Sequence, residues 1–177
     1  MGAEAGSTGT SSRRLVLLRH AKASRELEQP DVDRPLTGRG RRDATAAGQW
    51  LAAHVGTPDL VLCSTAARTR QTWASACQAE PDVLGPAAVR LEEAVYLAWP
   101  DTLLELVSQV PPSTRTVVLV GHSPGVPDLA ERLSRFSGAA PLGDFPTAAI
   151  AVLAVAGSWS ALGPGTATLD AYVVPRA

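Results

Sequence analysis

Two histidines and two arginines stand at or just beyond the ends of short apolar runs in this 177-residue chain. They are Arg19, His20, Arg68 and His122. An arginine offers phosphate two parallel N–H donors and keeps its charge at any physiological pH. A neutral imidazole can attack phosphorus and carry the phosphoryl group covalently, and a second imidazole can donate to the equatorial oxygens. Brought together, the four side chains would form a site for binding and attacking a dianion.

Three apolar runs must position these side chains. They are Leu15–Leu18, Leu60–Cys63 and Thr116–Val120, and runs of this length bounded by polar residues predict buried strands. Segments with helical periodicity lie between them, so the sequence predicts an α/β fold: a three-layer α/β/α sandwich with a mostly parallel sheet. Ligands bind at the carboxyl ends of strands in such sheets. We therefore expect the two histidines and two arginines to converge at one edge of the sheet.

Four helices and three further strands complete the predicted order of elements. The helices are expected at 38–54, with Thr37 as its cap, at 65–77, with Ser64 or Thr65 as its cap, and at 101–110 and 126–135. A short strand is expected at 89–91, and two late strands at 148–155 and 167–174 are expected to pair as a hairpin. Residues 1–12, rich in Gly, Ser and Thr, are expected to form a disordered tail ahead of one domain at 13–177.

The composition excludes several classes of protein. Apolar residues make up 45%, charged residues 19%, and the net charge is −1, which is typical of a globular domain and argues against nonspecific binding to nucleic acid or anionic membranes. No apolar run is long enough for a transmembrane helix, and the start of the chain lacks the pattern of a signal peptide. The two cysteines are therefore expected to be reduced thiols in a cytoplasmic protein. No cluster of His, Cys, Asp or Glu has metal-ligand spacing, so we expect no metal and no other cofactor.

Four segments resemble, in the right order, the motifs of the histidine phosphatase superfamily, to which the phosphoglycerate mutases and the small SixA-type phosphohistidine phosphatases belong. Residues 17–21 resemble its Arg-His-Gly signature, 34–40 its Pro-Leu-Thr…Gly stretch, 63–72 its Ser-Pro-x-x-Arg-x-x-Gln-Thr segment, and 120–123 its second histidine motif. Ala21 and Thr65 replace the usual glycine and proline. The resemblance runs from about residue 15 to residue 155 and implies the phosphoglycerate mutase-like fold.

The resemblance also implies roles for individual residues. His20 would be the nucleophile, and Arg19, Arg68 and His122 would bind the phosphoryl group. Glu93, preferred to Glu92, would be the proton donor, although both could equally be surface glutamates. Lys22 and Ser64 are candidates for secondary phosphate contacts, with a solvated loop lysine and an ordinary polar serine as the alternatives.

The length of one segment bears on the substrate. About 20 residues separate Glu93 from the strand beginning at Thr116, too few for the long helical insertions that cover the substrate in larger relatives. An open pocket can admit a phosphorylated side chain of another protein, and access of water favours hydrolysis over a mutase reaction. We therefore expect a SixA-like protein phosphohistidine phosphatase. A small-molecule phosphomonoesterase of the same superfamily is the alternative, so the partner is a phosphorylated protein or a small phosphoester.

A competing motif, Gly121-His122-Ser123-Pro124-Gly125, fits the G-x-S-x-G pattern of α/β-hydrolase esterases. In that fold the catalytic histidine follows the serine in the chain, and no histidine follows His122 here. A noncatalytic phosphate-binding module would keep the arginines but could lose either histidine, and both are present. These two readings are therefore less favoured than the phosphatase.

Overall fold

The computed structural model describes residues 13–25, 29–135 and 142–177, so the expected tail at 1–12 lies outside it. Its sheet has six strands in the order β3-β2-β4-β1-β5-β6. The strands are β1 (Arg13–Arg19), β2 (Leu60–Ser64), β3 (Ala88–Glu92), β4 (Thr116–Gly121), β5 (Ile150–Val155) and β6 (Ala167–Val173). The helices are α1 (Gly38–His54), α2 (Ala67–Ala79), α3 (Pro81–Leu84), α4 (Pro100–Ser108) and α5 (Gly125–Ser134), with 3-10 turns η1 (Asp31–Asp33), η2 (Glu93–Val95) and η3 (Trp159–Ala161).

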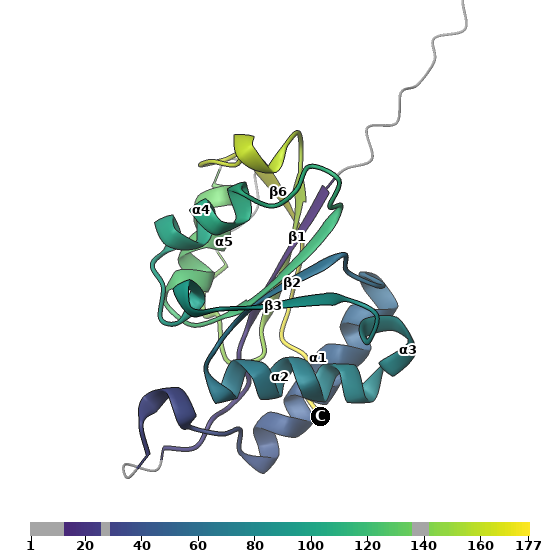
Figure 1. Cartoon of the computed structure of the whole chain (residues 1–177), viewed down its shortest axis with the longest axis vertical. Coiled ribbons are helices and arrows are strands. Elements are labelled where there is room, and N and C mark those ends of the chain that lie inside the picture. Colours follow the sequence, from purple (N-terminus) through teal and green to yellow (C-terminus); the bar gives the residue numbers. More distant parts are fainter. Residues whose placement is uncertain (1–12, 26–28, 136–141) are drawn as a thin grey trace, which may run out of the picture.

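The predicted α/β/α sandwich is confirmed. Strands β3, β2, β4 and β1 run parallel, while β5 pairs antiparallel with β1 and with β6. Helices α1, α2 and α3 cover one face of the sheet, and α4 and α5 cover the other (Figure 1). Among the described residues, none of the helices combines the length and the hydropathy needed to cross a bilayer.

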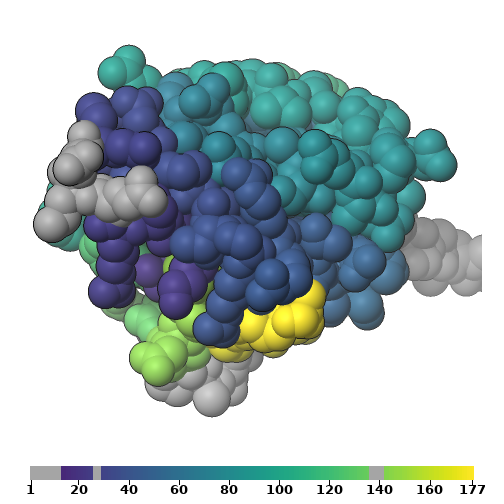
Figure 2. Space-filling view, turned by 90° about the horizontal axis from the view of Figure 1, so that it is seen from below, coloured from purple at the N-terminus to yellow at the C-terminus, as the bar shows by residue number. Residues whose placement is uncertain are grey.

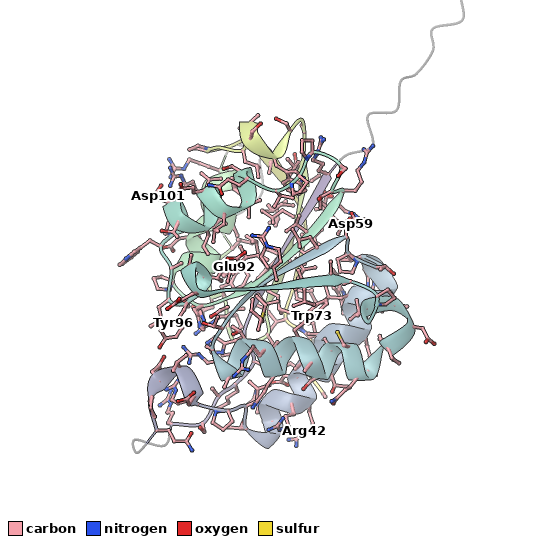
Figure 3. The ribbon with its side chains drawn as sticks, viewed as in Figure 1. Arg42, Asp59, Trp73, Glu92, Tyr96 and Asp101 are labelled. Atoms are coloured by element: carbon pink, nitrogen blue, oxygen red, sulfur yellow. The ribbon has the colours of Figure 1, made fainter. Side chains whose placement is uncertain are left out.

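Each face of the sheet has its own hydrophobic core. On one face Leu51 of α1 and Trp73 of α2 pack against β-strand side chains, and Trp73 projects from α2 toward the strands in Figure 3. On the other face Val107 of α4 and Leu129 of α5 pack against Leu119 of β4. Full burial of a side chain of this size contributes roughly 1.5–3 kcal/mol, so the two cores hold the strands in the register that the site requires.

Helix caps and one close helix contact explain how α1 and α2 sit on the sheet. The Thr37 hydroxyl accepts the Gly40 N–H, as predicted for the cap of α1. The predicted cap of α2 is wrong, since Ala66 occupies that position and no side chain caps the helix. Ser64 cannot serve because it is still part of β2. At Gly48 the two helices come so close that a Cβ atom would overlap the backbone of α2.

The described register aligns the carboxyl ends of four parallel strands. Arg19 of β1 lies opposite Gly121 of β4, and Ser64 of β2 lies opposite Glu92 of β3. The polar residues that follow these strands therefore emerge at one edge of the sheet. The segment 81–86 contains the single-turn helix α3, because Pro81 is favourable in the first turn of a helix.

Candidate active site

His20 and His122 are neighbours at the carboxyl edge of the sheet. Each is the first residue after its strand, and β1 and β4 are adjacent and in register there. Their ring centroids are 5.2 Å apart, with an angle of 54° between the ring planes. Both side chains are buried, with 9% and 3% of their surface exposed. The two imidazoles therefore face one small volume from adjacent strands.

The tautomer of His20 follows from one hydrogen bond. Its Nδ1 lies 2.8 Å from the carbonyl oxygen of Ala21, and a carbonyl can only accept, so Nδ1 carries the proton. Burial, together with the charges of Arg68 and Arg19, lowers the pKa of His20 to about 4. The ring is therefore neutral near pH 7, and its Nε2 carries a free lone pair. This is the protonation state that a nucleophilic imidazole needs.

His122 is held by a serine. Its Nε2 lies 2.8 Å from Oγ of Ser64, whose side chain is completely buried. Burial, followed by the charges of Arg68 and His20, lowers the pKa of His122 to about 3. Nδ1 is buried and has no hydrogen-bond partner among the described residues. With the Ser64 hydroxyl donating to Nε2, the Nδ1 proton is available to a phosphoryl oxygen.

Arg68 enters the site from the first turn of α2 and is 2% exposed. Its Nη1 donates to the backbone oxygen of Asp31 at 2.6 Å, and its Nη2 donates to Oδ2 of the same residue at 2.9 Å. The Tyr96 hydroxyl donates to that Oδ2 at 2.6 Å, and the Tyr96 ring packs edge-on against His122. The anionic carboxylate of Asp31 thus already accepts one of the N–H donors of the Arg68 guanidinium.

The charge state of Asp31 follows from these contacts. The hydrogen bond from Tyr96, followed by the hydrogen bond and charge of Arg68, lowers the pKa of the Asp31 carboxyl. The same bond raises the pKa of the Tyr96 hydroxyl. Asp31 is therefore an ionised acceptor near neutral pH and is poorly suited to donate a proton.

Backbone contacts fix Arg19 and His20. Arg19 Nη1 donates to the carbonyl of Phe145 at 2.6 Å, and burial lowers the pKa of the guanidinium. The His20 N–H donates to the Gly121 carbonyl, and the Ala148 N–H donates to the carbonyls of Arg19 and His20. Ala148 adopts a φ of 62°, a left-handed conformation that costs a non-glycine residue energy and lets its N–H serve both carbonyls.

A cavity of about 430 Å³ opens beside these groups. Arg19, His20 and Lys22 line it, together with residues from α1, from the segment before β5 and from the C-terminal segment. Figure 2 views this end of the molecule, where the purple segment after β1 lies between blue, light-green and yellow surfaces. Lys22 is exposed, and the cavity is larger than a single phosphoryl group needs.

The remaining candidate residues lie outside this cluster of contacts. Glu93 begins η2 and is exposed, and Glu92 forms an ion pair with Arg90. No hydrogen bond or ion pair joins Glu93 to either histidine within the described part of the chain. Ser123 follows His122 and is partly exposed, without a hydrogen bond to an imidazole in the same ranges. In residues 13–25, 29–135 and 142–177, no group of three or more His, Cys, Asp or Glu residues could hold a metal ion.

Sequence reasoning missed Asp31 and Tyr96. Asp31 comes from η1, which lies between β1 and α1, and reaches the site because η1 packs beside α2. Its position three residues before the Arg34–Gly40 stretch was the one available signal. Tyr96 is three residues beyond Glu93, and no motif in the sequence points to its hydroxyl group.

Known proteins are similar to this chain over most of its length. The family model of the histidine phosphatase superfamily (branch 1) matches residues 15–116. An uncharacterized protein of Mycobacterium tuberculosis is 42% identical over 165 residues, covering 90% of this chain and 100% of that protein.

Two solved structures are similar over nearly their whole length. A protein of Nakamurella multipartitia, provisionally assigned as phosphohistidine phosphatase SixA, is 40% identical with a TM-score of 0.82, covering 94% of this chain and 98% of the other. A protein of Agrobacterium tumefaciens with the same provisional assignment is 30% identical with a TM-score of 0.77, covering 92% and 98%. The matched family segment includes Arg19, His20 and Arg68, while His122 lies beyond it.

Proposed function

The chain belongs to the histidine phosphatase superfamily and is a hydrolase acting on phosphoryl groups, and from this premise we propose that it dephosphorylates phosphohistidine on a protein. The observation that carries the proposal is the neutral His20 imidazole. Its Nδ1 proton is bound by Ala21, and its free Nε2 stands beside His122 among cationic side chains.

The proposed reaction has two displacements at phosphorus. In the first, Nε2 of His20 forms a bond to phosphorus while the P–N bond to the substrate imidazole breaks, and the departing ring takes up a proton. In the second, water attacks the phosphoryl group on His20, the new P–N bond breaks, and inorganic phosphate leaves. Arg19, Arg68 and His122 would donate hydrogen bonds to the equatorial oxygens in both steps, where their charges and dipoles offset the developing negative charge.

The proton for the leaving group is assigned to Glu93 in this proposal. Asp31 is closer to the arginines, but its lowered pKa leaves it ionised. Imidazole is a better leaving group than an alkoxide, so a phosphohistidine substrate needs little help from an acid. An exposed carboxylate at the end of β3 is therefore compatible with cleavage of a P–N bond.

Two observations support phosphohistidine as the substrate. The solved relatives from Nakamurella and Agrobacterium are provisionally assigned as phosphohistidine phosphatases. The chain also has only α4 between η2 and β4, so it has no long insertion to enclose a small substrate. A small phosphomonoester is the second candidate, favoured by the 430 Å³ cavity, which lies in the usual range for small-molecule sites. Action in the cytoplasm belongs to the same proposal.

The experiment compares turnover of a phosphohistidine-bearing protein domain with turnover of a panel of phosphate monoesters, in buffer containing EDTA. We expect the highest kcat/KM on the phosphohistidine domain, and acid quenching is avoided because phosphohistidine is acid-labile. His20→Ala should lose activity on every substrate while keeping the wild-type circular dichroism spectrum. A labelled phosphoryl group trapped on Ser123, or activity that requires added metal, would overturn the mechanism.

A further inference from the structure

The cavity beside His20 is lined by far more positive charge than one phosphoryl group requires. Six cationic side chains line it, and the lining residues in the described part of the chain include no Asp or Glu. The six are Arg19, Lys22, Arg25, Arg34, Arg39 and Arg176. They come from four separate parts of the chain: the end of β1 with the segment after it, the segment before α1, α1 itself and the C-terminal segment. The fold, rather than a local charge run, gathers them at one place.

Counterions from the protein neutralise only part of this charge. Among the described residues, two carboxylates form ion pairs with the six cations: Asp31 pairs with Arg34, and Asp43 pairs with Arg39 and Arg176. Asp31 also forms an ion pair with Arg68. Within residues 13–25, 29–135 and 142–177, about four positive charges are left without a carboxylate partner, and a phosphoryl dianion at His20 would offset two of them. The remaining positive charge favours the binding of a second anion.

The far wall of the cavity is built around a buried carboxylate. Asp43 of α1 is 2% exposed, and its Oδ2 lies 3.6 Å from Nε of Arg39 and 3.6 Å from Nη1 of Arg176. Arg176 Nη1 also donates to the Thr147 carbonyl at 2.9 Å, which ties the C-terminal segment to the segment before β5. Asp43 thus holds two guanidinium groups side by side at the cavity wall.

From this arrangement we propose that the cavity is a subsite for a second anionic group, a phosphate or a carboxylate, carried by the same molecule as the reacting phosphoryl group. Arg39, Arg176 and Lys22 would bind the second group while Arg19 and His20 engage the first. The proposal rests on the proposed function, since it assumes that the reacting phosphoryl group lies at His20. It adds that substrates with one isolated charge use only part of the site.

The volume agrees with two groups. A cavity of about 430 Å³ holds roughly 14 waters at about 30 Å³ each, whereas a phosphoryl group has only one phosphorus and three oxygen atoms. Arg39 is 59% exposed and Arg176 is 34% exposed at the side chain, so solvent screens each contact. Each of these two arginines is therefore expected to contribute about three- to tenfold in affinity.

Binding of three non-hydrolysable probes tests the subsite without relying on turnover. Methylphosphonate carries one anionic group, phosphonoacetate adds a carboxylate, and methylenediphosphonate adds a second phosphonate. Calorimetry at constant ionic strength should give tighter binding, about tenfold, for at least one of the two larger probes than for methylphosphonate. Tighter binding of both identifies a subsite that accepts either anion. Tighter binding of methylenediphosphonate alone identifies a phosphate subsite, and of phosphonoacetate alone a carboxylate subsite.

Matched variants separate the subsite from general attraction. In Arg39→Gln and in Arg176→Gln, the ratio of the affinity for the larger probe to the affinity for methylphosphonate should fall about three- to tenfold. Arg42→Gln removes the same charge from an exposed position on α1 that does not line the cavity, labelled in Figure 3, and should keep the advantage. Equal affinities for all three probes, or equal losses in Arg39→Gln and Arg42→Gln, would overturn the proposal. Absence of phosphatase activity with a preserved probe preference would instead count against the proposed function.

Discussion

The imidazole rings of His20 and His122 lie 5.2 Å apart, centroid to centroid, at the ends of adjacent parallel strands. Both rings are buried, and burial lowers the pKa of each chiefly because it disfavours the charged form. The charges of Arg68 and Arg19 lower both pKa values as well. A proton added to either imidazole would be repelled by both arginines. Both imidazoles are therefore neutral near pH 7, which is the state that the proposed reaction requires.

The first prediction concerns the acid side of the activity profile. Because the pKa of His20 is about 4, the proposed nucleophile stays neutral well below the usual range for histidine. We expect kcat/KM, which reports the free enzyme, to show no loss from His20 protonation between pH 8 and about pH 5.5. Steady-state kinetics over this range, corrected for ionisation of the substrate, measure it. A half-loss near pH 6.5 would mean that His20 titrates like a solvated imidazole.

The same lowered pKa values predict a loss of stability in acid. The unfolded chain binds protons on these histidines near pH 6.5, whereas the folded protein binds them only near pH 4 for His20 and pH 3 for His122. Acidification therefore favours the unfolded state, by about 1.4 kcal/mol per pH unit for each group between these limits. Chemical denaturation at several pH values should show His20→Asn losing less stability than the wild type between pH 7 and pH 4.5. Parallel curves for the two proteins would contradict the prediction.

Asp31→Asn should strengthen binding of phosphate. The carboxylate of Asp31 accepts from Arg68 and so competes with an incoming phosphoryl group for the same guanidinium. Removing its charge while keeping its shape should lower the inhibition constant of inorganic phosphate about threefold, a modest effect because the carboxylate is half exposed. Inhibition assays measure this constant. Weaker binding of phosphate would show that the charge of Asp31 is needed to position Arg68.

Ser64→Ala should impair His122 without touching the phosphoryl group directly. Loss of the 2.8 Å hydrogen bond to Nε2 frees the ring to rotate, and a neutral hydrogen bond of this kind corresponds to roughly 3- to 10-fold in rate. We expect the loss in kcat, with little change in KM. Ser75→Ala, a buried serine two turns further along α2 than Arg68, is the matched control. Equal kinetics in the two variants would remove Ser64 from the site.

Glu93→Gln should distinguish substrates by their leaving groups. Alkoxide departure from a phosphoester needs a proton, and general acid catalysis contributes about 10²–10⁴-fold, whereas imidazole departure needs less. The variant should therefore slow an alkyl phosphate far more than a phosphohistidine, while Glu92→Gln changes both little. Measuring kcat for both variants on an alkyl phosphate and on a phosphohistidine tests this prediction. Equal losses would indicate a role in binding, and no loss on either would identify Glu93 as a surface residue.

The fold could be predicted because its signals are local. Apolar runs such as Leu15–Leu18 and helical spacing in α1 are visible in a short window of sequence, and strand order then places Arg19 and His122 at one edge. Asp31 and Arg176 could not be predicted in the same way. Their contacts with Arg68 and Asp43 join segments 37 and 133 residues apart, and no local pattern encodes such a pairing.

The prediction of a side-chain cap for α2 was wrong for a related reason. A serine just ahead of a helix is a strong cap signal, but the β2 ladder extends through Ser64, and its hydroxyl bonds to His122 and accepts the Ala66 N–H ahead of the helix. A tertiary contact overrode the local preference. The error therefore marks a residue whose hydroxyl serves the site rather than the helix.

The junction between Lys22 and α1 has a consequence for engineering. The Lys22 carbonyl accepts both the N–H and the hydroxyl of Thr37, and a Cβ at Gly40 would overlap that carbonyl. The loop is thus docked through its main chain, while the lysine side chain is exposed at the cavity and takes no part in the docking. Position 22 can be randomised in a library to retarget the enzyme toward new leaving groups, whereas position 40 should stay glycine in every member of that library.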